Sequence, residues 1–246
     1  MISNSAPAIP LWEARAPTSN GQGDRRAPAE LGHQMRQLLG PSRRVRVAAR
    51  GIRYQEGEAA TNAFVLRSGL VKLVSHLHSG RARIVRLCAS GGLLGTGGVV
   101  HPTYEHTAVA VDDMEVEAIP TRRLARLRKT SPQLYARIAE RWYGELRDAD
   151  TWIMQFSTGS IRARVARLVD YLSMIRSPDG LGGDEHRSRV SLLTCGEMAA
   201  VLGVTPESVS RVLAEFKRKG LLQTVACEAH EGHECNVPAL RAIAQD

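Results

Sequence analysis

The stretch TCGEMAAVLGVTPESVSRVLAEFKRKGLL, residues 194–222, decides how the second half of this chain folds. Thr194 and Glu197 have the spacing of a capping box at the start of a helix. Gly203 is suited to end that helix, because glycine takes the left-handed turn conformation without a steric penalty. Thr205, followed by a proline, predicts the cap and first turn of a second helix. Two short helices at this spacing predict a helix-turn-helix.

The second helix of this motif is predicted to read DNA. Its inward positions are apolar: Val209, Val212, Leu213 and Phe216. The residues predicted to contact DNA lie on its outer surface or close its ends: Thr205, Glu207, Ser208, Ser210, Arg211 and Lys217. Arginine suits guanine as a bidentate donor, glutamate can accept from cytosine, and serine contacts bases or phosphate. The alternative is a helical hairpin inside a globular core, which the spacing and the two caps disfavour.

Three cations, Lys217, Arg218 and Lys219, end the second helix. These cations could contact DNA phosphates. Equally, they could serve only to stabilise the helix, because positive charge is favourable at a helix C-terminus.

A long helix is predicted to begin at Ser131, with serine as its cap and proline in its first turn. An apolar stripe at roughly heptad spacing runs along it, with Leu146 beside it: Tyr135, Ile138, Trp142, Ala149, Ile153 and Phe156. The stripe could cover its own domain, but a two-helix seam between subunits fits a helix this long. We therefore predict a homodimer through these six residues.

The first half of the chain has a different pattern. Short β-rich runs alternate with glycines between about residues 45 and 119, which predicts a β-barrel or sandwich. Residues 31–39 and 121–129 read as short helices. Residues 1–28 are rich in Ser, Pro, Gly and Arg, which is typical of a disordered tail. This tail is either an inert extension or a basic arm that touches DNA phosphates.

These patterns predict an α+β chain of four parts. The disordered basic tail covers residues 1–28, and a β-barrel domain covers 29–129. The dimerisation helix covers 130–158, and a helix-turn-helix domain with a terminal hairpin covers 159–246.

The net charge of +8 indicates an anionic partner, but this charge is unevenly distributed. Residues 160–246 hold 11 Lys or Arg and 11 Asp or Glu, so this segment is neutral. The excess lies before residue 160, with nine arginines in residues 1–53 alone. Net charge by itself does not identify the DNA-binding part.

Several other classes of protein are disfavoured. No run of about 18 apolar residues is present, so no membrane span is expected, and the N-terminus lacks the pattern of a secretory signal. The four cysteines lack the spacing of a disulfide framework, which fits the reducing cytoplasm. We do not expect an enzyme, because the chain has no evident pairing of a nucleophile with a base and no phosphate-binding glycine loop.

Over residues 31–246 the chain resembles the CRP/FNR family of bacterial transcription regulators. The resemblance rests on the long helix, the helix-turn-helix and four further stretches: YQEGE at 54–58, FVLRSGLVKL at 64–73, IVRLCASGGLLGTGG at 84–98 and RARVARLVDYL at 162–172. It implies a jelly-roll barrel, similar to cyclic-nucleotide-binding domains, that senses a signal. It also implies a dimerising helix, a winged helix that binds a palindrome in double-stranded DNA, and contact with RNA polymerase.

Glu207, Ser210 and Arg211 look like the Glu-x-x-Ser-Arg signature of the FNR-like branch of this family. The resemblance implies TTGAT-type half-sites, with Arg211 on guanine and Glu207 on cytosine or supporting Arg211. Ser210 would contact thymine or the backbone. Pro206 departs from the family pattern and has no hydrogen-bond donor, so any contact that the family makes from that position is in doubt.

The same resemblance bears on the signal. Cyclic-nucleotide binding in this family uses a Glu and an Arg-Ser pair, but here Thr96 stands at the Glu position and His106-Thr107 at the pair. Because no arginine occurs between residues 95 and 111 to meet a phosphate, cAMP is not expected. No cysteine precedes Cys88, which excludes an iron–sulfur cluster held by N-terminal cysteines.

Haem is an alternative signal group, with four candidate ligands: His76, His78, His101 and His106. The competing interpretation is that these histidines lie at the surface or are hydrogen-bonded within the protein. Cys88 is interpreted as a small buried hydrophobe, with a redox role as the alternative.

The terminal segment CEAHEGHEC at 227–235 is unexpected in a wing that approaches DNA. Four potential soft-metal ligands fall within it: Cys227, His230, His233 and Cys235. Strands at 223–227 and 233–237 around a turn would bring the two cysteines together. The interpretations are a solvated loop or a zinc or redox site. The alternative function is a haem- or redox/metal-responsive sensor whose signal site is either the barrel or this hairpin at 227–235.

Overall fold

The computed structural model describes residues 42–176, 187–225 and 232–245. The predicted tail and the predicted helix at 31–39 lie outside these residues, as do Cys227 and His230. Within the described ranges, no helix is long and apolar enough to cross a membrane.

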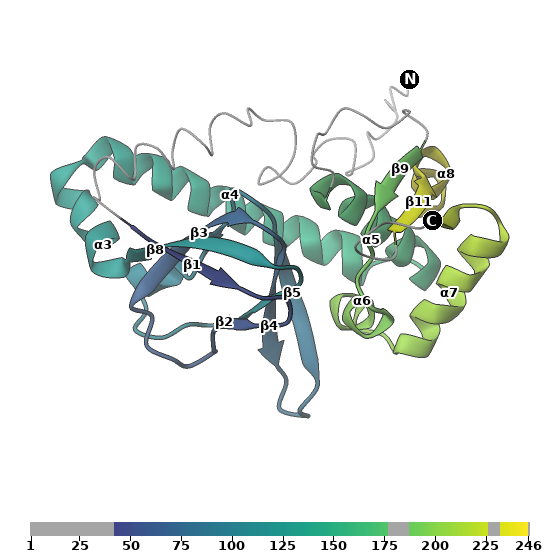
Figure 1. Cartoon of the computed structure of the whole chain (residues 1–246), viewed down its shortest axis with the longest axis horizontal. Helices are drawn as coiled ribbons and strands as arrows, with labels where there is room; N and C mark the ends of the chain where they lie inside the picture. Colours follow the sequence, from purple (N-terminus) through teal and green to yellow (C-terminus); the bar gives the residue numbers. More distant parts are fainter. Residues whose placement is uncertain (1–41, 177–186, 226–231, 246) are drawn as a thin grey trace, which may run out of the picture.

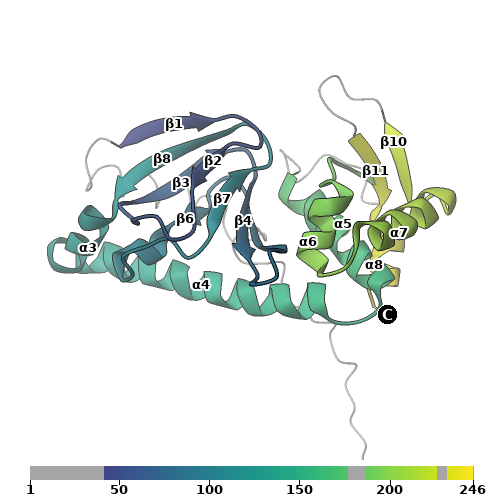
Figure 2. The ribbon, with the colours of Figure 1, turned by 90° about the horizontal axis from the view of Figure 1, so that it is seen from below.

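Residues 43–120 form a β-sandwich of two four-stranded antiparallel sheets (Figures 1 and 2). One sheet contains, in spatial order, β1 (Arg43–Val47), β8 (Met114–Pro120), β3 (Asn62–Ser68) and β6 (Leu93–Leu94). The other contains β2 (Ile52–Tyr54), β7 (Thr107–Ala110), β4 (Val71–His76) and β5 (Ala82–Cys88). A short 3-10 helix, η1 (Thr96–Val99), follows β6. The predicted β-barrel or sandwich is confirmed.

The core of the sandwich is made by side chains that alternate inward from both sheets. Phe64 and Leu66 of β3 meet Val71 of β4 and Val116 of β8, and all four are almost completely buried. Burying each large apolar side chain contributes roughly 1.5–3 kcal/mol to stability. This two-sheet core is why the short, glycine-punctuated runs form strands.

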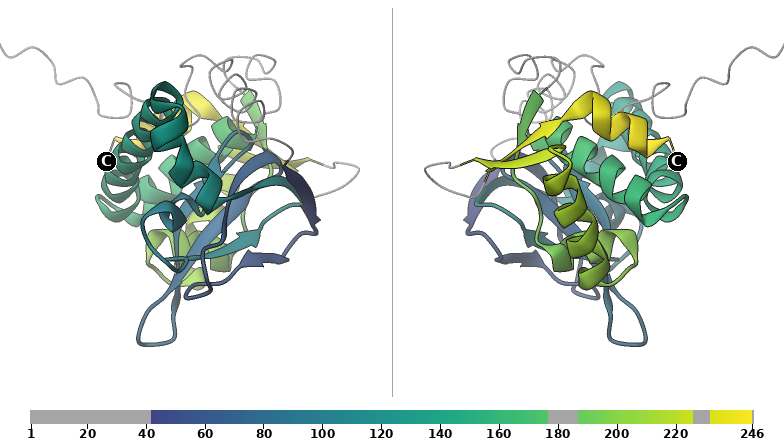
Figure 3. Two further views of the ribbon diagram at one scale, coloured as in Figure 1. Left: turned by 90° about the vertical axis from the view of Figure 1, so that its left-hand side faces the viewer. Right: turned by 90° about the vertical axis from the view of Figure 1, so that its right-hand side faces the viewer.

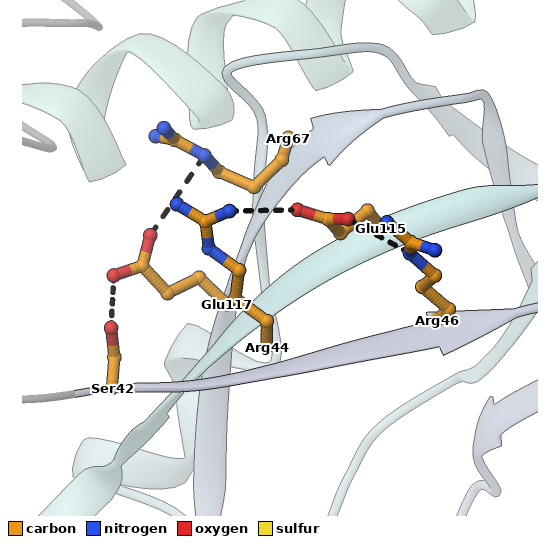
Figure 4. A network of polar contacts seen from close by, with 6 residues as sticks. All are labelled: Ser42, Arg44, Arg46, Arg67, Glu115 and Glu117. Carbon is orange, nitrogen blue, oxygen red and sulfur yellow. Dashed lines mark hydrogen bonds and ion pairs between the residues drawn. The ribbon is translucent and has the colours of Figure 1, made fainter.

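Ion pairs on the outer face of the first sheet hold its edge strand β1 (Figure 4). Glu115 of β8 meets Arg46 at 3.1 Å and Arg44 at 3.7 Å. The neighbouring Glu117 is almost completely buried and lies 3.8 Å from Arg67 of β3. The Arg46–Glu115 pair is largely exposed and adds little, whereas the buried Glu117 carboxylate depends on its partners.

Two helices follow the sandwich. Helix α3 (Thr121–Thr130) turns back on it, and α4 (Pro132–Ser157) then runs along the whole sandwich to the second half of the chain (Figure 2). Pro132 is the first residue of α4, as predicted, and Ser131 occupies the cap position without a side-chain hydrogen bond.

The apolar stripe that predicted a dimer seam lies mainly on the side of α4 that faces its own subunit. Ile138 and Phe156 are 2% and 1% exposed, because each belongs to an apolar core of the subunit. Tyr135 and Trp142 lie edge to face, with ring centroids 6.0 Å apart, and pack against the cluster that contains Ile138. The prediction that Ile138 and Phe156 contact a partner is therefore corrected.

Helix α4 also carries large apolar side chains that nothing in the described subunit covers. Tyr143 is 63% exposed, Leu146 60%, Ile153 58% and Met154 51%. Of the six predicted seam residues, only Ile153 is among these exposed side chains, and Ala149 instead lines a pocket within the subunit. Heptad spacing found one apolar stripe, but α4 carries a second, exposed strip beside it, and Ile153 belongs to both.

The second half of the described chain is a winged-helix unit. Its elements are α5 (Ile161–Arg176), β9 (Arg187–Val190), α6 (Cys195–Leu202), α7 (Pro206–Arg218), β10 (Leu222–Val225), β11 (Gly232–Asn236) and α8 (Val237–Ala244). The three strands form one antiparallel sheet in the order β10-β11-β9. Strand β9 was not predicted, because its polar sequence lies beside a Pro/Gly-rich loop and its partner β11 is distant in sequence. Val237 begins α8 rather than ending a strand.

Candidate DNA-binding interface and sensor pocket

Helix α6 is the first helix of the motif, and its two ends are capped as the sequence predicts. The Thr194 hydroxyl accepts a hydrogen bond from the Glu197 amide at 3.2 Å, and the Glu197 carboxylate accepts from the Thr194 amide at 2.9 Å. Gly203 ends the helix with φ of 68°, in the left-handed region. A capping box of this kind satisfies backbone donors that the helix itself leaves unpaired.

Helix α7 lies across α6 and buries one side in the core of the winged-helix unit. Val209, Val212 and Phe216 are buried in the same cluster as Met198 and Leu202 of α6. Thr205 caps the helix, accepting from the Ser208 amide at 3.4 Å. The apolar side fixes the helix, so the opposite side is presented outward, and α7 lies at the front of the right-hand view in Figure 3.

The outward side of α7 carries Glu207, Ser210 and Arg211, all of them exposed. Hydrogen bonds from its own backbone amide and from the Thr205 hydroxyl, with Arg211 nearby, hold the pKa of the Glu207 carboxyl below its usual range. An ionised glutamate beside an arginine gives this surface one strong acceptor and one forked donor. These are the groups that distinguish base pairs in a major groove.

Two other residues predicted to contact DNA are occupied within the protein. The hydroxyls of Thr205 and Ser208 lie 3.1 Å apart, and Ser208 also accepts a hydrogen bond from Arg211 at 3.5 Å. Ser208 is half-buried. Thr205 and Ser208 therefore cap the helix and orient Arg211.

The cations at the end of α7 have different surroundings. Lys219 pairs with Glu215 at 2.8 Å, which is a helix-stabilising contact at i, i+4. Lys217 and Arg218 are exposed. Arg218 lies close to three full turns after Glu207, and so continues the outward line of Glu207 and Arg211. Lys217 lies about 80° around the helix from Glu207.

Aromatic rings fill the interior of the β-sandwich beside residues 95–111, the stretch that has no arginine to meet the phosphate of a cyclic nucleotide. Tyr54 and Tyr104 are stacked with their centroids 3.9 Å apart, and Phe64 stacks on Tyr54 at 5.7 Å. The Tyr104 ring lies so close to Gly95 that a Cβ there would come within 2.8 Å of it. The Tyr104 hydroxyl donates to the Asn62 carbonyl at 2.8 Å.

A small pocket lies elsewhere, where β5 meets α4 and α5. One wall is aromatic, made by Trp152, Phe156 and Tyr171, whose rings meet edge to face. On the other side, Arg86 of β5 pairs with Glu145 of α4 at 3.1 Å. The pocket therefore joins the sandwich, the long helix and the winged-helix unit.

The charged lining of this pocket is held inside the protein. Arg141 donates to the Gly91 carbonyl at 3.1 Å. Burial raises the pKa of the Glu145 carboxyl, although Arg86 opposes the shift. Burial also raises the pKa of the Cys88 thiol to about 12, so this cysteine is a neutral thiol at neutral pH. Arg86 and Glu145 were not predicted as site residues, although an arginine inside the apolar strand ARIVRLC is a signal that the sequence offers.

The histidines considered as haem ligands lie in different surroundings. His76 and His78 are exposed near the tip of the β4–β5 hairpin. His101 lies 3.1 Å from the Thr103 carbonyl. His106 is half-buried, 3.2 Å from the Ser75 hydroxyl, and burial lowers its pKa.

Only part of the predicted zinc set falls on described residues. His233 and Cys235 are both buried in β11, and Cys235 packs in the apolar core of the winged-helix unit. Among the described residues, no group of three or more His, Cys, Asp or Glu side chains is arranged to hold a metal ion. The zinc hypothesis stays a prediction.

A sandwich joined by a long helix to a winged helix defines a two-domain DNA-binding regulator. A family model described as a cyclic nucleotide-binding domain matches residues 44–131, and one described as a Crp-like helix-turn-helix domain matches 164–243. The chain belongs to the CRP/FNR family of transcription regulators.

Curated relatives and solved structures support this membership. The transcriptional activator protein Anr of Pseudomonas aeruginosa is 28% identical over 177 residues, covering 72% of this chain and 71% of the relative. A CRP-family transcriptional regulator from Thermus thermophilus superposes with a TM-score of 0.69 at 26% identity, covering 82% of this chain and 97% of that one. FixK2 from Bradyrhizobium japonicum shares the fold, with a TM-score of 0.70 at 20% identity, over 83% of this chain and 98% of that one.

Proposed function

We propose that this regulator binds, as a homodimer, a palindrome of two TTGAT-type half-sites, and that Glu207, Ser210 and Arg211 read each half-site. The observation that carries the proposal is the outward side of α7, where these three exposed side chains follow a rigidly capped first turn. Arg211 addresses guanine, Glu207 accepts from cytosine or steadies Arg211, and Ser210 contacts thymine or backbone. Lys217 and Arg218 supply phosphate contacts.

The homodimer forms through the exposed side of α4. Tyr143, Leu146, Ile153 and Met154 make an apolar strip along one side of a 26-residue helix, and a second copy of α4 is suited to cover it. A two-fold axis there places two α7 helices on one side of the dimer. Two half-sites about one helical turn apart, roughly 34 Å, match such symmetry. RNA polymerase is the partner through which a DNA-bound dimer would act.

The signal is a small molecule or redox change other than a cyclic nucleotide. The stacked Tyr54 and Tyr104 rings fill the space beside Gly95, and the sequence has Thr96 where a glutamate would hold the ribose. The pocket between β5, α4 and α5 is the candidate binding site for the signal molecule instead. A ligand that binds there would favour one position of α4 over others, and this shift would change the distance between the two α7 helices of the dimer.

Fluorescence anisotropy with a TTGAT palindrome, set against scrambled DNA of equal length, tests the reading proposal. We expect Arg211→Ala to weaken palindrome binding by about 1–3 kcal/mol and to relax the preference at one base pair. Lys217→Ala is the matched control, because loss of a phosphate contact weakens all sequences alike and makes the salt dependence less steep. Equal loss on every sequence for Arg211→Ala would contradict base reading.

A further inference from the structure

The β-sandwich touches the helix-turn-helix directly through α6, while the reading side of α7 stays free. Strands β4 and β5 form the hairpin that lies beside α6 (Figures 1 and 2). Val74 of β4 and Ile84 of β5 are buried in the same apolar cluster as Met198 and Val201 of α6. This contact surface thus continues the core of the winged-helix unit into the sandwich.

The start of α6 is held by a lysine from β4. Lys72 Nζ lies 2.6 Å from Glu197 Oε1, and the two side chains are only 17% and 22% exposed. The second oxygen of this carboxylate, Oε2, accepts from the Thr194 amide at 2.9 Å in the capping box. One carboxylate therefore closes the helix cap with one oxygen and binds the sandwich with the other.

The end of α6 is held by an arginine from β5. Arg83 Nη2 donates to the Val201 carbonyl at 3.3 Å. Its guanidinium lies against Gly203, so close that a Cβ at this position would be 1.8 Å from Nη1. The last carbonyls of a helix lack intrahelical donors, and a cation there is favourable. Arg164 of α5 donates to the next carbonyl, Leu202, at 3.1 Å.

We infer that Lys72 and Arg83 are positioning residues for DNA recognition: they hold both ends of α6 against the sandwich and thereby fix where α7 stands relative to α4. The inference rests on the proposed function, because position matters only when two reading helices must meet two half-sites. Neither residue touches the reading side, so they set geometry and leave base preference unchanged. Strand β5 also lines the pocket through Arg86, so movement of this strand on ligand binding would be passed to α6.

The test compares full-length wild-type protein with Lys72→Met and Arg83→Met on two DNAs, a TTGAT palindrome and a duplex with a single half-site. We expect palindrome affinity to fall by about 5–20-fold, in the range of ordinary coupling between sites, while single half-site affinity stays unchanged. Lys72→Arg keeps an ion pair with Glu197, so this variant should bind the palindrome as the wild type does. Lys129→Met is the matched control, since it removes one positive charge from exposed α3 and leaves both affinities as in wild type.

Each other outcome overturns the positioning role. Equal loss on both DNAs means that Lys72 and Arg83 stabilise the motif or touch phosphate, and no loss means that the apolar contact suffices. A gain in palindrome affinity means that the contact restrains the domain from binding. If wild-type protein fails to prefer the palindrome over scrambled DNA, the proposed function fails instead, and circular dichroism of each variant reports whether it is folded.

Discussion

Replacing Gly203 by alanine measures how closely α6 is seated against the sandwich. Gly203 has φ of +68°, a region where a side chain with a Cβ is strained by roughly 1–2 kcal/mol. The new Cβ would also lie 1.8 Å from Arg83 Nη1, so this flexible side chain must swing away and lose its bond to Val201. That bond contributes about 0.5–1.5 kcal/mol. The two effects together predict that Gly203→Ala lowers the free energy of unfolding by about 1.5–3.5 kcal/mol.

Two other glycines separate these effects. Gly220 has nearly the same φ, +69°, with nothing within 4 Å of a new Cβ, so Gly220→Ala should lower stability by only the conformational amount, roughly 1–2 kcal/mol. Gly196 lies in α6 with open space around it, so Gly196→Ala should raise stability by up to about 1 kcal/mol.

Urea unfolding followed by circular dichroism gives all three values, and the same variants in an Arg83→Met background complete the test. The excess of Gly203→Ala over Gly220→Ala should vanish in that background, because the displaced contact is already gone. If the two alanine variants are equally destabilised in the wild-type background, Arg83 is not seated against Gly203 and the reasoning is refuted.

Further predictions concern the seam, the cap and the wing. Leu146→Glu should dissociate the dimer in light scattering, because a charge replaces an exposed apolar side chain on α4; a dimer that persists would refute this seam. Asp150→Leu should tighten the dimer, because this exposed acid lies on the same side of α4 and would face its copy across a two-fold axis; unchanged or weaker dimerisation would contradict that placement. Burial alone would raise the pKa of Glu197, but bonds from Lys72 and Thr194 hold it below its usual range. Its contribution to stability is therefore present above about pH 4.3 and is lost as pH falls through the lower folded value, so wild type and Glu197→Gln should converge in unfolding free energy in acid. A 1:1 zinc titration that leaves the hairpin thiols fully reactive would remove the zinc hypothesis.

The sequence alone predicted the helix-turn-helix nearly residue by residue. Its signals are local: a capping box at Thr194 and Glu197, a left-handed glycine at 203, and a threonine followed by proline at the next helix start. Each acts within one helical turn and needs no distant partner. The outward placement of Glu207 and Arg211 follows from the same helical arithmetic. Strand alternation and glycine spacing likewise sufficed for a β-sandwich.

Only the tertiary structure decided which surfaces those elements share. Periodicity marks an apolar stripe on α4 but does not say what covers it, and burial assigned Ile138 and Phe156 to the subunit's own cores. Lys72 and Glu197 are 125 positions apart in sequence, so no local pattern announces that they meet. Helix α7 is thus determined locally, whereas its position relative to the β-sandwich depends on long-range contacts that form only when both halves of the chain fold against each other.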